Sequence, residues 1–383
     1  MSRSANLITA LCLGAGVPAV AQSLDELNLQ IHGYATQGFL YTTSNNILTT
    51  TSSDGSPAWT EAVLNISAQP TAKLRVVVQG RYQLLGNLAN QITLDYAMAD
   101  YKQDDRFGVR FGKVKIPSGL FNEIQDIGPS YQWALLPQSM YPIESRNSQL
   151  SLFGGVVYGT LNGGGLGKLD YRGWGGENTL PSNDGDLLPL VEAGITLPSG
   201  FGGVQSGFAL HWKTPLAGLM IGASNTRRST ATSPATTSSG AATLIGLHSN
   251  ATSFFAQYEK ERIMIASEYG RTPGNFGLQF PGVPVSMVRF DDRGFYAMGT
   301  CKATNKLTAG AYFSQFFNRQ AALGPTRYSK DWTLSTRYDF NQFLYAKAEE
   351  HFIQGTAQSF DALLNPDLQP STKLTILKIG VTF

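Results

Sequence analysis

Leu-Thr-Ile-Leu-Lys-Ile-Gly-Val-Thr-Phe is the final stretch of the chain, residues 374–383. Counted back from the end, every second residue is apolar, namely Phe383, Val381, Ile379 and Leu377. The residues between them are Thr382, Gly380 and Lys378. This period of two predicts a β-strand with one apolar face. A strand that turns its apolar face outward needs a partner on each edge, so pairing of this last strand with the first would close a barrel.

The composition favours strands and turns over helices. The 383 residues include 41 Gly, 21 Phe and 16 Tyr, and only 15% are charged. This length suits a single large barrel as well as several soluble domains. After the N-terminal segment the sequence has no apolar run long enough for a membrane helix, so only a closed barrel could satisfy the backbone in a bilayer.

The N-terminus has the features of a secretory signal. Met-Ser-Arg is followed by a mostly apolar run over residues 7–20 and then by Ala19-Val20-Ala21. This order predicts a signal peptide over residues 1–21 and a single mature barrel domain over residues 22–383. Cleavage would remove Cys12 and leave Cys301 alone, so no internal disulfide is expected.

Charge and motifs exclude several classes of function. The chain has 29 Lys and Arg against 27 Asp and Glu, and Arg3 lies in the leader, which leaves a mature net charge of about +1. Nucleic-acid binding is therefore not expected. The four histidines lie far apart and no hydrolase or phosphate-binding motif is complete, so we expect no enzyme, metal or cofactor.

Alternation along the chain predicts about 16 strands, an even number within the range of bacterial membrane barrels. The expected strands are 29–41, 58–69, 73–84, 91–101, 106–114, 148–160, 166–174, 204–213, 216–228, 247–259, 262–271, 293–302, 306–317, 330–340, 342–352 and 374–383. The run 190–197 is ambiguous. Each of these strands is long enough to cross a bilayer when tilted, whereas strands of a soluble sandwich are usually shorter.

The expected connections alternate between short and long. The short connections are 70–72, 102–105, 214–217, 260–261 and 340–341. The long connections are 43–57, 115–147, 175–203, 229–246, 272–292 and 355–370, of which 229–246 reads as a flexible polar loop. Short turns at one end and long loops at the other indicate a transmembrane barrel. The alternative is a secreted soluble sandwich or propeller.

Three segments resemble bacterial outer-membrane porins. They are Ile31-His32-Gly33-Tyr34-Ala35, the run Lys113-Val114-Lys115-Ile116-Pro117-Ser118-Gly119-Leu120-Phe121-Asn122-Glu123, and the terminal Phe383. The resemblance implies a homotrimer of 16-stranded all-β antiparallel barrels in the bacterial outer membrane. It also implies that the third external loop, 115–147, folds inward. Outer-membrane lipid and small hydrophilic solutes are then the expected partners.

An inward loop would bring opposite charges together. We expect Glu123 and Asp126 on the loop to face basic residues on the wall and at the loop entrance, and two acidic residues of nearby strands to join them. The wall and entrance residues are Arg75, Arg81, Arg110, Lys113 and Lys115, and the acidic residues are Asp95 and Glu61. Such charges across a constriction would favour polar solutes. Further candidates are Lys168, Asp170, Arg172, Arg337 and Lys347.

Each candidate also has a structural interpretation. Arg81 should lie opposite Thr93 or Asp95 and could pair with that carboxylate. Glu123 and Asp126 could instead be solvated charges on an outer loop.

The functional hypothesis is a water-filled channel for passive diffusion of small hydrophilic solutes, with a mild preference for anions. The alternatives are a substrate-specific channel, an outer-membrane barrel hydrolase and a secreted adhesin.

Overall fold

The structure, a computed structural model, describes residues 27–383. The expected signal peptide, 1–21, lies outside the described residues. The strands are β1 (Gln30–Thr42), β2 (Ser56–Thr71), β3 (Leu74–Leu85), β4 (Ala89–Lys102), β5 (Gly108–Lys115), β6 (Ser151–Asn162), β7 (Lys168–Leu180), β8 (Phe201–Lys213), β9 (Leu219–Thr230), β10 (Ser233–Thr237), β11 (Gly240–Lys260), β12 (Ile263–Gln279), β13 (Ser286–Lys302), β14 (Leu307–Asn318), β15 (Tyr328–Asp339), β16 (Leu344–Gln354) and β17 (Ser371–Thr382). The helices are α1 (Arg146–Leu150) and α2 (Leu188–Glu192), with 3-10 turns η1 (Ser52–Asp54), η2 (Gly128–Ser130), η3 (Ile143–Ser145), η4 (Gly164–Leu166), η5 (Gly185–Leu187) and η6 (Pro325–Arg327).

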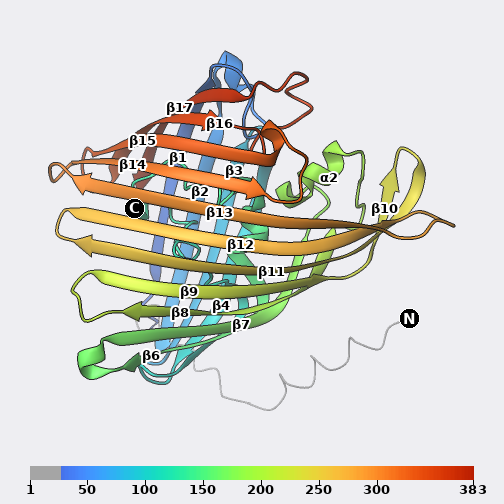
Figure 1. Cartoon of the computed structure of the whole chain (residues 1–383). Coiled ribbons are helices and arrows are strands. Elements are labelled where there is room, and N and C mark those ends of the chain that lie inside the picture. Colours follow the sequence, from blue (N-terminus) through green and yellow to red (C-terminus); the bar gives the residue numbers. More distant parts are fainter. Residues whose placement is uncertain (1–26) are drawn as a thin grey trace, which may run out of the picture.

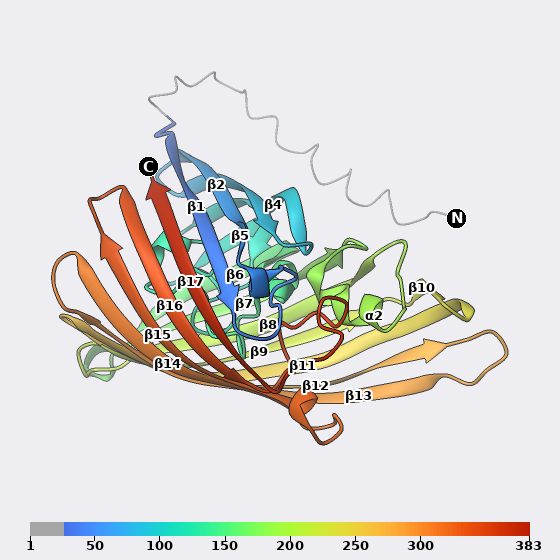
Figure 2. The same cartoon turned by 90° about the horizontal axis from the view of Figure 1, so that it is seen from above.

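Sixteen of the strands form a closed antiparallel barrel, and β10 is an additional strand that pairs with β11 and forms an isolated bridge to Thr196 (Figure 1). The last strand closes the ring by pairing with the first, as the sequence predicts. Gly38 lies opposite Lys378 in this pair. The backbone amides of Gly33 and Phe383 each donate to the other residue's carbonyl oxygen at 3.1 Å. In Figure 2 the end of β17 accordingly lies beside the start of β1.

Alternate residues of β17 face the outside and the inside of the barrel. Leu377, Ile379 and Val381 are about half exposed on the outside of the barrel. An apolar outer face of this kind suits a bilayer. The inward residues do not all suit water, because Leu374 and Ile376 are also apolar and have no exposed surface. No helix in the described part of the chain is long and apolar enough to span a membrane.

Two of the predicted long loops are wrong. Most of 272–292 belongs to β12 and β13, which continue past the ends of their neighbours at the same end of the barrel as β10 (Figure 1). The Ser- and Thr-rich tract 229–246 forms β10 and the start of β11. Threonine and serine can pair cross-strand in a hairpin, so a polar composition alone did not exclude a strand. The ambiguous run 190–197 contains the end of α2.

Candidate functional site

The connection between β5 and β6, residues 116–150, turns into the barrel, and we call it the interior loop. The hydroxyl of Tyr34 on β1 donates to the backbone oxygen of Asp126 at 2.9 Å. The hydroxyl of Ser139 donates to the backbone oxygen of Phe295 on β13 at 3.0 Å. Because β1 and β13 are not neighbours of β5 or β6 in the ring, the interior loop crosses the space enclosed by the strands.

Charged residues of β16 bind the backbone of the interior loop. The Lys347 ammonium donates to the carbonyl oxygen of Trp133 at 2.7 Å. The Glu349 carboxylate accepts from the backbone amides of Ala134 at 2.8 Å and Leu135 at 3.0 Å. A loop buried among side chains needs partners for its backbone polar groups, and charged partners make the stronger hydrogen bonds. Lys347 and Glu349 therefore hold the middle of the loop against the wall.

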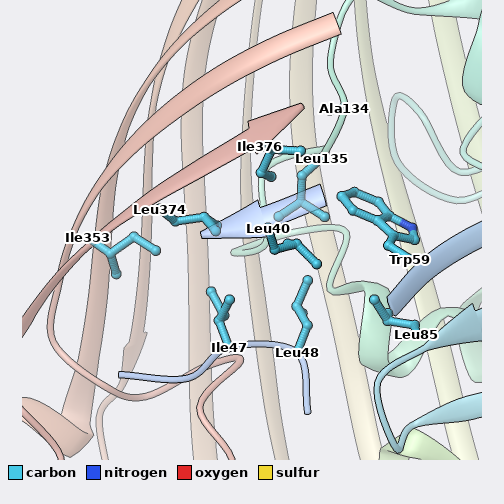
Figure 3. Close-up of a cluster of buried hydrophobic side chains, with 10 residues drawn as sticks. All are labelled: Leu40, Ile47, Leu48, Trp59, Leu85, Ala134, Leu135, Ile353, Leu374 and Ile376. Atoms are coloured by element: carbon cyan, nitrogen blue, oxygen red, sulfur yellow. The ribbon is translucent and has the colours of Figure 1, made fainter. Parts of the chain in front are cut away.

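Apolar side chains also hold the middle of the interior loop against the wall. Figure 3 shows Leu135 of the interior loop among side chains from β1 and β17, including Leu40, Leu374 and Ile376. These three wall residues have no exposed surface, and Leu135 is 3% exposed. Burial of one such side chain contributes about 1.5–3 kcal/mol. The inward apolar residues of β17 are thus explained by the loop that covers them.

A second apolar cluster packs other side chains of the interior loop against β12, β13 and β14. The Trp133 and Tyr312 rings meet edge to face, with centroids 4.9 Å apart. Gly119 approaches the wall closely, and a Cβ there would lie 2.7 Å from Oε1 of Glu268 and 2.9 Å from the hydroxyl oxygen of Tyr141. With φ at 63°, this position favours glycine for its backbone conformation as well.

Asp95 is the centre of a buried ion-pair network. The strand register shifts opposite Gln79 and Gly80, which makes Asp95 an extra residue in β4 and directs its carboxylate inward. Arg146 of the interior loop binds this carboxylate through both terminal nitrogens, at 3.0 and 2.9 Å. Arg81 also pairs with it, at 3.3 Å. The structural interpretation of Arg81, a pair with Asp95, is the one the structure has.

Two other ion pairs, each of which includes a residue that the sequence singled out, are buried as well. Lys115 donates to the Asp126 carboxylate at 2.7 Å, and Gln79 donates to its other oxygen at 2.7 Å. Lys378 donates to Glu61 at 2.8 Å. Asp126 therefore faces the barrel wall, as expected for an inward loop, rather than outside solvent. These groups are too deeply buried to meet a solute directly.

The charges around Glu123 are different because water reaches them. Arg110 binds one Glu123 oxygen at 3.0 Å and Arg172 binds the other at 3.3 Å. Arg110 also pairs with Asp100 at 3.1 Å. Burial by itself would raise the pKa of the Glu123 carboxyl, but Arg172 and Arg110 outweigh burial and hold that pKa below its ordinary value. We call Arg110, Glu123 and Arg172 the Glu123 triad; their side chains are 20–27% exposed.

Two of the basic candidates, Arg75 and Lys113, lie away from the triad. Arg75 is exposed near the short-turn end and donates to the Ser67 hydroxyl at 3.1 Å. Lys113 lies over the Phe153 ring, which faces outward, and donates to the backbone oxygen of Leu94. The structure thus separates Lys113 from the inward cluster in which it was expected.

Sequence reasoning missed Arg146 and Glu349. Arg146 follows the proline-rich part of the insert, where alternation gives no direction for a side chain. Glu349 could have been predicted, because it alternates with Lys347 and His351 along one strand and therefore faces the same side as the candidate Lys347. His351 is fully buried and contacts Asp331 at 2.9 Å. Within residues 27–383, no group of three or more His, Cys, Asp and Glu side chains is arranged to hold a metal.

Comparison with known proteins relates the chain to others by structure alone. No family model matches it, and no curated protein does. The anion-selective porin from Comamonas acidovorans matches with a TM-score of 0.59 at 9% identity, over 93% of this chain and 99% of that chain. The Salmonella typhi OmpF complex with daunomycin matches with a TM-score of 0.56 at 14% identity, over 94% and 99%. The outer membrane channel DcaP of Acinetobacter baumannii matches with a TM-score of 0.58 at 7% identity, over 94% and 99%.

The chain has the porin fold. The match extends over almost the whole length of each neighbour, so the expected porin-like barrel of about 16 strands is confirmed. A porin-fold barrel closes on itself, and the alternative of a soluble sandwich or propeller is therefore wrong. At these identities the likeness concerns the fold, and it assigns no solute to the chain.

Proposed function

We propose that the protein is a bacterial outer-membrane channel through which small hydrophilic solutes diffuse passively, with a mild preference for anions. The observation that carries this proposal is the Glu123 triad. It is an inward-facing charged group that remains partly exposed, whereas the charges around Asp95 are buried. Solutes would pass the triad between the interior loop and the wall. Since the interior loop crosses the barrel to reach β1, β13 and β16, the channel should admit only small solutes.

The proposed preference for anions follows from the hydrogen bonds within and around the Glu123 triad, which occupy the carboxylate oxygens but leave some arginine N–H groups without a partner. Both oxygens of Glu123 are occupied by arginines. Asp100 is likewise bound by Arg110 and by the Tyr158 hydroxyl. A guanidinium has five N–H donors, so Arg110 and Arg172 retain donors for a passing anion after these bonds are made. A cation would find fewer free oxygens at the same place.

Reversal potentials in planar bilayers under a KCl gradient test the proposal. The wild type should favour chloride over potassium. Arg110→Gln/Arg172→Gln should lower the anion-to-cation permeability ratio about threefold or more, since one charge about 6 Å from an ion in water contributes roughly 0.7 kcal/mol. Arg106→Gln, an exposed arginine in a short turn, is a matched control and should leave the ratio unchanged. A cation-selective wild type would refute the proposal.

A related experiment separates passive diffusion from a substrate-specific channel. Conductance should fall smoothly, without saturation, when small sugars or organic anions are added. Saturable block by one solute would instead favour the substrate-specific alternative.

The proposal includes assembly into homotrimers in the outer membrane. One Vibrio cholerae OmpT structure among the matches, with a TM-score of 0.52 at 10% identity over 93% of this chain and 98% of that chain, is described as a trimer form. Native mass spectrometry of the detergent-solubilised protein would show whether three copies associate.

A further inference from the structure

Four arginines gather on the outside of the barrel, across β9, β12 and β13. Three features place them there: Arg227 lies opposite the outward Ser206, Arg271 lies opposite Arg293, and Arg293 is two residues from the exposed Phe295. The fourth is Arg289, which is exposed and precedes Arg293 by four residues in β13. These residues face away from the interior and cannot serve the proposed channel directly.

The positive charge of this arginine cluster is only partly balanced. Asp291 pairs with Arg271 at 2.7 Å and with Arg293 at 3.2 Å. Among the described residues no ion pair engages Arg227 or Arg289. The Arg293 Nε atom is buried and has no hydrogen-bond partner in the part of the chain that the structure describes. One carboxylate for four guanidinium groups leaves donors and charge for an external anion.

The arginine cluster lies at the edge of the outward apolar band that is farther from the short turns. Tyr269 and Phe295 are exposed on the outer wall one step nearer the short-turn end than Arg271 and Arg293. Arg271 is eight positions from the start of β12 at Ile263. At about 3.3 Å per residue and a tilt near 40°, eight positions rise about 20 Å, which approaches the height of about 25 Å typical of a membrane barrel's apolar band. The arginines therefore stand where headgroups begin.

A shallow groove of about 620 Å³ lies beside Arg227, Arg271 and Arg289 on the outer wall. Its lining adds further hydrogen-bonding groups from His248, Asn250 and Asn275. Arginine binds phosphate oxygens bidentately and is well suited to a partly desolvated interface. We propose that this arginine cluster binds the phosphate group of an anionic membrane lipid.

The location favours a lipid over a soluble anion. A ligand here can place its phosphate among the arginines while its acyl chains lie along the apolar wall that includes Tyr269 and Phe295. A free phosphate would gain only the first of these interactions. Lipid phosphate should therefore bind more tightly than inorganic phosphate at the same site.

Lipid titration of the full barrel in neutral detergent tests the proposal. Dioctanoyl phosphatidic acid is the probe, and dioctanoylglycerol, which has the same tails without phosphate, is its comparator. Native mass spectrometry should show the phosphatidic acid bound preferentially. Arg227→Gln/Arg289→Gln leaves the Asp291 pairs intact and should weaken binding about 25-fold, which corresponds to about fivefold for each arginine.

The control is Arg106→Gln/Arg262→Gln, which removes the same charge from turns at the opposite end and should bind as the wild type does. Heat-dependent migration on gels verifies that each variant is folded. Equal lipid binding by Arg227→Gln/Arg289→Gln would overturn the proposal. Inorganic phosphate that binds as tightly as the lipid would also overturn the proposal, because it would indicate a site for soluble anions. A changed number of associated copies in the Arg227→Gln/Arg289→Gln variant would overturn it as well, because it would indicate that the arginines form a contact between subunits.

Discussion

The interior of this barrel contains two sets of ion pairs made from the same residue types. In the Asp95 network, the Arg81 and Asp95 side chains are 3% and 1% exposed. In the Glu123 triad, the Arg110 and Glu123 side chains are 20% and 27% exposed. The first set fastens the interior loop to the wall, and the second faces the space left beside it. Burial, rather than residue type, distinguishes charges that hold the loop from charges that could meet a solute.

The largest effect is expected in the buried set. Asp95→Ala would leave the guanidinium groups of Arg81 and Arg146 together without a carboxylate. Removing one partner of a buried ion pair typically costs about 3–5 kcal/mol. Urea unfolding in detergent should show a loss in that range, and single-channel recordings should show increased conductance if the interior loop is released.

Asp95→Asn keeps the shape of the side chain and serves as the companion variant. It should show a smaller loss of stability than Asp95→Ala. Equal stability of Asp95→Ala and the wild type would contradict the anchoring role of this network.

The apolar anchor should have the next largest effect. Leu135→Ala removes a buried side chain from the cluster around Leu40 and Leu374. Loss of a buried leucine costs about 2–5 kcal/mol, and we expect about 3 kcal/mol. The same unfolding assay measures it. Leu363→Ala, at a side chain that is 72% exposed, is the matched control and should change stability little.

A pH effect of the order of 1 kcal/mol is expected where three loops meet. Burial, followed by the nearby Glu192, Asp361 and Asp186, raises the pKa of Glu144 from its ordinary value of 4.5 to about 7. Because the folded state retains the proton, this contribution to stability is full below about pH 4.5 and is lost as the pH rises through about 7. The magnitude is reduced because Glu144 is partly exposed.

Limited proteolysis of the connections 181–200 and 355–370 at pH 5 and pH 8 would detect the change. These connections are joined where the amide of Ala362 donates to Glu192 at 2.9 Å. Cleavage should be faster at pH 8 in the wild type. Glu144→Gln should reduce that pH difference, and a variant that keeps the full difference would exclude Glu144 as its origin.

The smallest effect on stability is expected in the Glu123 triad. Glu123→Gln should cost less than about 1 kcal/mol, because partly exposed ion pairs contribute little. It should nevertheless raise the anion-to-cation permeability ratio about threefold, since a negative charge beside the proposed path is removed. An unchanged ratio together with a large loss of stability would place the triad among the anchors.

The strands were largely predictable because alternation is a local property. Val381, Ile379 and Leu377 face outward as the period of two predicts, and pairing of β17 with β1 followed from the need to satisfy both strand edges. The polar tract that forms β10 was missed because its composition resembles that of a loop. For the site, the sequence named several residues that form ion pairs in the interior, such as Arg110 with Glu123. It could not rank them by burial.

The sequence by itself determined the barrel, because the direction of each strand side chain follows from its position in the strand. Only the tertiary structure decided which interior charges are covered, since that depends on where residues 116–150 lie after they leave β5. Arg146 and Glu349 become partners of distant segments through that path. The inward Leu374 and Ile376, unfavourable in a water-filled interior, become favourable once Leu135 packs against them.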